Sequence, residues 1–268
     1  MKPRADSAFR QFVRERVPDG VRKPLGRAAS RFFQVVLEPL LGCWFDVFIR
    51  VYRTEGCVFK IPRDLTSRQF RASFLLDVYE AEERELIGRF VRPGDRVLEY
   101  GACLGVVSCT TAKRIGESAK HVVVEGNPLL ISTIARNRVR NGASFVIENG
   151  AASASADYVD FHIHPVYVVG GSTRNVGLVR FRVAGLPLGE LHRRHGSFDV
   201  LILDIEGAEL ELLTAGVSDL AGYRVVILEL HRFAYGDDGL ARCREILAGA
   251  GFAWQATAGD TEAWVRSP

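Results

Sequence analysis

The chain has 268 residues, of which 47% are hydrophobic and 25% charged, and its formal net charge is +3 at pH 7. These values are typical of an ordinary soluble globular protein. The small net charge says little about partners, and we expect no nucleic-acid partner. The length favours one domain with an appendage. We expect a basic, amphipathic helical segment over residues 1–55 and an α/β domain over residues 56–268.

The N-terminal segment carries most of the charge asymmetry, because arginine and lysine greatly outnumber acidic residues before residue 32. Such a segment can contact anionic lipid or an acidic partner, but a solvated tail or a helix packed on the domain is the simpler interpretation. The apolar run over residues 32–52 is interrupted by a proline and three charged residues. It therefore predicts an amphipathic helix, on the domain or at a bilayer surface, rather than a spanning helix.

The cysteines indicate the compartment. There are five, and none forms a C-x-x-C pair. This pattern favours reduced thiols over a disulfide framework or a zinc site. No signal peptide is evident either, so we expect a cytoplasmic protein.

The hydrophobic pattern predicts a short strand pair over 51–61 and a helix over 75–91, which ends before Pro93-Gly94. Strands and helices then alternate as in a right-handed βαβ sheet. The expected strands are 97–100, 121–125, 145–148, 199–204 and 224–230, and the expected helices are 106–115, 128–140, 188–195, 209–215 and 238–250. A hairpin of 158–164 with 178–183, enclosing a long loop over 169–177, interrupts this rhythm, and an antiparallel pair of 252–256 with 263–266 closes the sheet.

The chain is organised around a strand that runs into the turn Gly101-Ala-Cys-Leu-Gly105. Glycines allow positive φ and close ligand approach, and the free N–H groups of the following helix can bind a polar group. The spacing Glu-x-Gly-x-x-x-Gly lacks the second glycine of a dinucleotide fingerprint, because Cys103 occupies that position. An acidic Glu99 before the turn suits the cationic amino-acid part of S-adenosylmethionine. A plain strand-to-helix turn is the alternative.

Polar residues follow the other strands at the same edge of the sheet. Glu125 is placed to accept hydrogen bonds from a ribose diol, and the small residues after Glu148 provide a surface for adenine. Asp204 and Glu206 follow the fourth strand and His231 follows the fifth. These groups can act as a general base or hold a divalent cation.

These blocks, in this order, resemble the FkbM-type S-adenosylmethionine-dependent methyltransferases. The resemblance covers about residues 58–230 and is carried by Tyr79-Glu80, Pro93 to Gly105, Val124 to Pro128, Asn149 to Ala152, Asp204 to Glu209, and Glu229. It implies a class I methyltransferase (Rossmann-like) fold and O-methylation of a hydroxyl group on a sugar, glycolipid or polyketide-type product. Together with the strand ends it predicts cofactor contacts at Glu80, Glu99, Gly101, Ala102, Cys103, Gly105, Glu125, Gly126, Asn127, Asn149, Gly150, Ala151 and Asp204.

The sequence departs from the family pattern in two places. Glu99, Tyr100, Cys103 and Leu104 replace the usual residues of the glycine block, and Ile202 replaces a lysine common in the fourth strand. The departures at Cys103 and Ile202 keep a non-catalytic binding protein open as an alternative. An NAD(P)-dependent oxidoreductase would use the same sheet and is the other alternative, although the spacing of Gly101 and Gly105 argues against it.

For the reaction we expect Asp204, Glu206 and His231 to be catalytic and the acceptor to be a small-molecule hydroxyl. We prefer metal-independent transfer, with Mg²⁺ as the alternative. The acceptor pocket is expected to combine the N-terminal region with the loop over 169–177. The sequence leaves the oligomeric state open, a homo-oligomer included.

Overall fold

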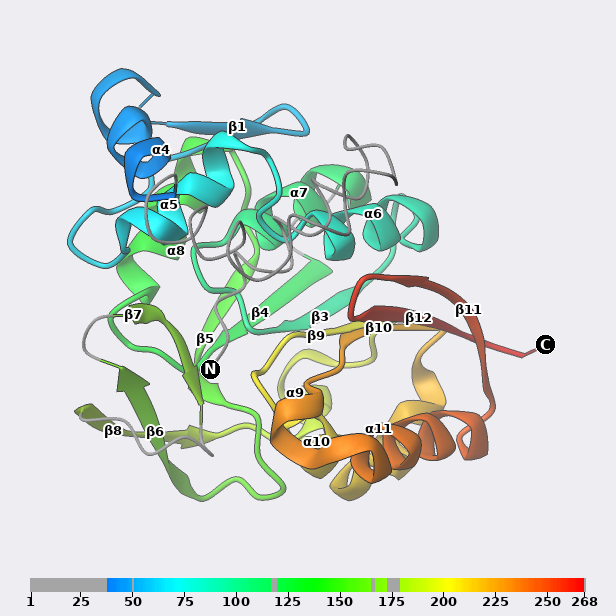
Figure 1. Cartoon of the computed structure of the whole chain (residues 1–268). Coiled ribbons are helices and arrows are strands. Elements are labelled where there is room, and N and C mark those ends of the chain that lie inside the picture. The colour runs from blue at the N-terminus through cyan, green and yellow to red at the C-terminus, as the bar shows by residue number, and fades with distance from the viewer. Residues whose placement is uncertain (1–37, 50, 117–119, 165–166, 173–178, 268) are drawn as a thin grey trace, which may run out of the picture. The chain divides into compact units, whose positions relative to one another are not determined.

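The computed structural model describes residues 38–49, 51–116, 120–164, 167–172 and 179–267, and the expectations for residues 1–37 lie outside that range (Figure 1). The chain divides into two compact units. The first contains the residues up to 54 together with 58–81, and the second contains 55–57 together with 82–268. We expect a domain boundary between residues 55 and 56. The division into units does not test whether the parts fold independently, so this boundary stays a prediction.

The first unit contains α4 (Glu38–Trp44), the π-helical turn η2 (Phe45–Ile49) and α5 (Arg68–Leu75). A two-stranded sheet of β1 (Tyr52–Thr54) and β2 (Cys57–Phe59) confirms the expected strand pair. Asp46 forms a 2.7 Å ion pair with the buried Arg71, and aromatic rings pack around Phe74. Pro39 does not break α4, because it lies in the first turn, where its missing N–H has no helical partner to lose.

Among the described residues of the first unit, four large apolar side chains are exposed. They form the apolar strip Leu40, Trp44, Val47 and Phe48, each more than half exposed. The rings of Trp44 and Phe48 contact each other, with centroids 4.5 Å apart. Among the described residues, no helix is long and apolar enough to cross a membrane.

The second unit is built on a ten-stranded sheet in the order β11-β12-β10-β9-β3-β4-β5-β8-β6-β7. The strands are β3 (Val97–Tyr100), β4 (His121–Glu125), β5 (Val146–Ala151), β6 (Tyr158–His164), β7 (Tyr167–Ser172), β8 (Val179–Gly185), β9 (Val200–Leu203), β10 (Val225–Glu229), β11 (Phe252–Ala258) and β12 (Thr261–Arg266). The five neighbouring strands from β10 to β5 are parallel, whereas β11 and β12 form an antiparallel pair. This arrangement confirms the predicted mostly parallel sheet.

Helices cover both faces of the sheet, as Figure 1 shows. They are α6 (Ala81–Phe90), α7 (Val106–Ile115), α8 (Ile131–Arg140), α9 (Leu188–His195), α10 (Glu209–Ala215), the short 3₁₀ turn η4 (Val217–Gly222) and α11 (Arg232–Gly249). Alternate residues of β3 enter different cores: Leu98 and Tyr100 pack with α9, α10 and α11, whereas Val97 packs with α6 and α7. Burial on both faces explains why these strands are almost entirely apolar.

The structure differs from the expected elements in several places; α11, for example, begins at Arg232 rather than at residue 238. The helix expected over 75–91 is two helices, α5 and α6, because the chain turns between them with positive φ at Asp77 and Glu80. Helix α8 begins three residues later than expected, because the Asn127 side chain accepts a hydrogen bond from the N–H of Leu129 and forms a turn first. Part of the loop expected over 169–177 is strand β7, and residues 173–178 lie outside the described range.

Candidate functional site

The glycine turn follows β3 at the carboxyl edge of the sheet, between β4 and β9. Gly101 has a φ of 95°, and a Cβ at that position would lie only 1.7 Å from the carbonyl oxygen of Asp204. Glycine is therefore required here both by conformation and by the close approach of the neighbouring strand end. Gly105 has a φ of 76° and begins α7. The turn brings the ends of β3 and β9 together.

Glu125 is the carboxylate closest to this turn. One of its oxygens accepts a hydrogen bond from the N–H of Cys103 and the other from the N–H of Asn127, both at 2.7 Å. Its side chain is 6% exposed. Burial raises the pKa of Glu125 to about 7, against the two amide bonds, and the charges of Asp204 and Glu99 add to the shift. Each oxygen retains lone-pair capacity, so this carboxylate can accept hydroxyl donors from a ribose.

Cys103 contacts Glu125 through its backbone N–H and not through its thiol. Its φ of 49° lies in the left-handed region, which most side chains avoid. This conformation directs the Cys103 N–H to Glu125. Cysteine in place of the residue usual in the family pattern therefore keeps the backbone N–H donor of the turn. All five cysteines are free thiols, and three of them are buried.

Glu99 does not lie where the sequence analysis expects it. It is 1% exposed and shares the face of β3 that packs under α7. One carboxylate oxygen accepts a hydrogen bond from the Ser108 hydroxyl, and the other lies 2.9 Å from Nε2 of the buried His121. Both oxygens are occupied by neighbouring side chains inside the core. The expected contact between Glu99 and the cofactor therefore does not fit this structure.

The remaining residues expected around the adenine differ in accessibility. Asn149 is exposed, and its side-chain amide donates to the carbonyl of Glu125 at 2.8 Å. Gly126 and Gly150 lie against Phe161 and Leu186, so that a Cβ on either glycine would overlap those side chains. Three further residues with expected contacts are buried: Ala102, Asn127 and Ala151. Among these residues Asn149 is thus the one whose side chain is open to solvent beside Glu125.

A histidine surrounded by carboxylates occupies the ends of β9 and β10. The Nε2 atom of His231 lies 3.7 Å from Oδ1 of Asp204 and 3.6 Å from Oε2 of Glu206. An oxygen of Glu229 is also 3.6 Å from the same nitrogen. His231 itself is 5% exposed. The structure therefore brings together the three residues expected to be catalytic, with Glu229, which the two-residue period of the strand also predicts to lie on the face of His231.

Glu209, the first residue of α10, is a member of this cluster that the sequence analysis missed. It is completely buried, and its Oε1 lies 2.9 Å from Nδ1 of His231. The same oxygen accepts hydrogen bonds from the N–H groups of Ile205 and Gly207. Burial opposes the charged form of His231, but the hydrogen bond and charge of Glu209, with the charges of Glu229 and Asp204, raise its pKa to about 10. The sequence could have indicated Glu209, because it is the third acidic residue of the block Asp204 to Glu209, after Asp204 and Glu206.

Glu80 belongs to the first unit, in the turn before α6, where its φ is 49°. Its expected contact with the cofactor stays a prediction.

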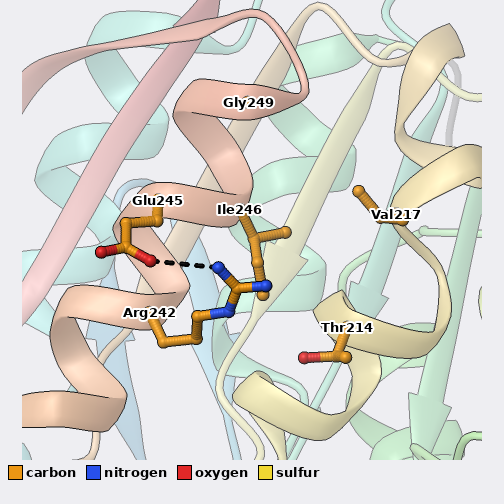
Figure 2. Close-up of a pocket in the computed structure, with 6 residues that line it drawn as sticks. All are labelled: Thr214, Val217, Arg242, Glu245, Ile246 and Gly249. Carbon is orange, nitrogen blue, oxygen red and sulfur yellow. Dashed lines mark hydrogen bonds and ion pairs between the residues drawn. The ribbon is translucent and has the colours of Figure 1, made fainter.

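A surface hollow elsewhere in the second unit contains none of the expected site residues. Figure 2 shows that it lies between α10, η4 and α11, with Arg242 and Glu245 joined by a 3.0 Å ion pair at its side. Its other lining residues are Thr214, Val217, Ile246 and Gly249. No convergent set of titratable groups faces this hollow, which leaves the carboxyl edge of the sheet as the candidate site.

Weak similarities link the chain to several known methyltransferases. Ribosomal RNA large subunit methyltransferase E of Sorangium cellulosum (strain So ce56) is 33% identical over 81 residues, which are 30% of this chain and 38% of that protein. The chain thus spans little more than a third of this curated relative.

Two solved structures are also similar. A methyltransferase from Pyrococcus furiosus has 13% identity and a TM-score of 0.45, with coverage of 90% of this chain and 100% of that one. Aeropyrum pernix fibrillarin, solved with natively bound S-adenosyl-L-methionine, has 12% identity and a TM-score of 0.43, with coverage of 68% and 72%. These likenesses are too weak to carry an argument of their own.

The family match is broader. The model of the family described as the Methyltransferase FkbM domain matches residues 99–254, which include the glycine turn, Glu125 and the whole His231 cluster. The sheet order and the antiparallel β11–β12 pair agree with the expected Rossmann-like class I methyltransferase fold. Because the match covers more than half of the chain, the protein belongs to the FkbM-domain family of methyltransferases.

Proposed function

We propose that this protein transfers a methyl group from S-adenosylmethionine to a hydroxyl of a small molecule, such as a sugar, glycolipid or polyketide-type product. The observation that carries the proposal is the His231 cluster, which lies at the same sheet edge as the glycine turn. Family membership supports methyl transfer in general. The cluster supports a hydroxyl acceptor, because transfer to an alcohol oxygen requires a group that accepts the hydroxyl proton.

The residues around the glycine turn fit such a methyl donor. Its ribose hydroxyls need acceptors, and Glu125 offers a buried carboxylate beside the turn. Its ammonium and sulfonium charges are favoured near the acidic groups Glu125 and Asp204. Asn149, exposed next to Glu125, is placed to contact the adenine. When bound, S-adenosylmethionine would supply an electrophilic methyl group on sulfur.

The chain's own contribution is positioning and proton transfer. Asp204 and Glu206 accept a hydrogen bond from the acceptor hydroxyl and take up its proton as the oxygen becomes a nucleophile. His231, hydrogen-bonded to Glu209, lies 3.6–3.7 Å from both carboxylates at the sheet edge. Alignment of two bound reactants in this way can supply about 7–11 kcal/mol of the barrier in favourable cases.

The first test is calorimetric titration of the full chain with S-adenosylhomocysteine, with NAD⁺ as the control ligand. Micromolar binding of S-adenosylhomocysteine that is weakened in Glu125→Ala supports the proposal. Binding of NAD⁺ instead would favour the oxidoreductase alternative, and binding of neither would favour a non-catalytic protein.

The second test concerns the acceptor. Transfer of labelled methyl to a panel of hydroxyl compounds identifies its class. Asp204→Asn should then lose transfer while largely retaining its affinity for S-adenosylhomocysteine, because the variant loses the proton acceptor while this ligand lacks the sulfonium charge that the carboxylate would favour. Equal turnover of the variant and the natural protein would rule out a role of Asp204 in the reaction.

We also propose a cytoplasmic protein whose apolar strip contacts an anionic membrane surface. The five free cysteines support the compartment. Exposed Trp44 and Phe48 support the surface, because amphipathic aromatic residues favour the bilayer interface, and the basic segment before residue 32 is complementary to anionic lipid. Such a contact would bring a lipid-linked hydroxyl acceptor to the enzyme.

A further inference from the structure

We propose that Asp204, Glu206 and His231 bind one divalent cation, Mg²⁺ or Mn²⁺. The inference deepens the proposed function and depends on it for the cation's role in the reaction. The existence of the site itself is argued from these residues alone.

The strongest observation is the unsatisfied nitrogen of His231. Its Nε2 atom is buried and has no hydrogen-bond partner. The three oxygens around it, from Asp204, Glu206 and Glu229, lie at 3.6–3.7 Å, too far for a hydrogen bond. A buried polar atom normally has a partner, so a group is expected between this nitrogen and the oxygens.

The separation of these atoms fits a metal ion. One ligand atom from each of Asp204, Glu206 and His231 lies within 4.8 Å of the other two. In an octahedral site with bonds of about 2.1 Å, neighbouring ligand atoms are about 3 Å apart and opposite ones about 4 Å apart. The measured distances from Nε2 fall between these two values, so small side-chain movements would close the site around a cation.

Glu209 sets the ring of His231 in the orientation that a metal ligand needs. With Nδ1 bound to Glu209 at 2.9 Å, Nε2 is the ring nitrogen that faces the cluster, and it becomes a ligand when a cation displaces its proton. A cation there would complete a carboxylate–histidine–metal arrangement, in which Glu209 orients the histidine ligand.

The negative charge of the cluster around His231 also favours a cation. Four carboxylates, from Asp204, Glu206, Glu209 and Glu229, surround a single imidazole, and Asp204 and Glu209 are buried. Buried charges are retained where they are paired or coordinate metals.

The donor set favours a hard cation. Two carboxylates and one imidazole suit Mg²⁺ or Mn²⁺ better than a soft metal, and Cys103, Cys109 and Cys243 are not members of the cluster. Three protein ligands leave coordination positions for oxygen from the acceptor. A cation there would replace the two carboxylates, which would then be its ligands, in activating the hydroxyl. It would lower the pKa of the acceptor hydroxyl and orient its oxygen toward the methyl group.

The test is titration of the metal-free full chain with Mn²⁺. Binding is measured by electron paramagnetic resonance as the decrease in the signal of free Mn²⁺. We expect one site per chain, with binding lost in Asp204→Asn and Glu206→Gln. Glu209→Gln should weaken binding by about 10- to 100-fold, the usual effect of removing a group that orients a ligand. Glu245→Gln is the matched control, because this exposed acid pairs only with Arg242 in the hollow of Figure 2, and it should bind Mn²⁺ as the natural chain does.

A spectroscopic readout identifies the histidine directly. Pulsed spectra of bound Mn²⁺ should show coupling to an imidazole nitrogen, and His231→Gln should abolish it. Circular dichroism and thermal unfolding check that each variant is folded.

Absence of Mn²⁺ binding in the natural chain would overturn the proposal, as would binding that survives both Asp204→Asn and Glu206→Gln. Calorimetry with S-adenosylhomocysteine on the same preparation separates the two conclusions. If S-adenosylhomocysteine binds and Mn²⁺ does not, the metal-site proposal is wrong and the methyltransferase proposal stands. If Mn²⁺ binds and S-adenosylhomocysteine does not, the metal site stands and the proposed function is wrong.

Discussion

Cofactor affinity should depend on pH through Glu125. Burial raises the pKa of this carboxyl to about 7, so in the free protein it is protonated below that pH and ionised above it. Only the ionised form accepts two ribose hydroxyls in addition to its bonds with the N–H groups of Cys103 and Asn127. Affinity for S-adenosylhomocysteine should therefore be present above pH 7 and be lost as the pH falls through 7.

The size of this effect follows from the fraction of ionised protein. With a pKa of about 7, Glu125 is about 91% ionised at pH 8 and about 9% ionised at pH 6. Because the apparent dissociation constant scales inversely with the competent fraction, it should rise about tenfold from pH 8 to pH 6, or about 1.4 kcal/mol. The ligand's own α-carboxyl stays ionised over this range, and its amine stays protonated.

The assay is calorimetry of S-adenosylhomocysteine at several values between pH 6 and pH 8. Glu125→Gln is the control, since an amide of the same shape cannot ionise. It should bind more weakly at pH 8 and show a flat profile. A flat profile in the natural chain, or an unchanged slope in Glu125→Gln, would refute the reasoning.

Three further predictions address the turn, the core and the surface. Gly101→Ala should lower the free energy of unfolding, measured with urea, by more than Gly94→Ala does. Both glycines have positive φ, which costs alanine about 1–3 kcal/mol, but only at Gly101 would the new Cβ meet backbone. Ser108→Ala should destabilise the fold by about 1–3 kcal/mol, because it removes a hydrogen bond to the buried Glu99. It should leave S-adenosylhomocysteine affinity unchanged, and a loss of affinity would return Glu99 to the cofactor site. Serine in place of both aromatic residues of the apolar strip should reduce co-sedimentation with vesicles containing anionic lipid, whereas serine at the exposed Val139 should not; equal sedimentation of the two variants would contradict the membrane contact.

The sequence by itself determined the central elements and their order. The bounds of β3, β4, α7, α9 and α10 follow from the pattern alone, because buried parallel strands are short apolar runs punctuated by turns. The rule that parallel strands end at one edge also predicts that Asp204, Glu206 and His231 lie close together. These inferences use only the local hydrophobic pattern and the order of the elements, and both can be derived from the order of residues along the chain.

The tertiary structure alone decided what the polar groups do. Alternation along β3 places Glu99 on the face of Val97, but only the packing of α7 and β4 shows that Ser108 and His121 occupy its oxygens. Likewise, the contact of Glu209 with His231 joins the start of one helix to the end of a strand 22 residues away. The break between α5 and α6 was equally hidden, because no glycine or proline marks it. Such roles depend on distances between segments that are remote in the chain, and residue spacing does not encode those distances.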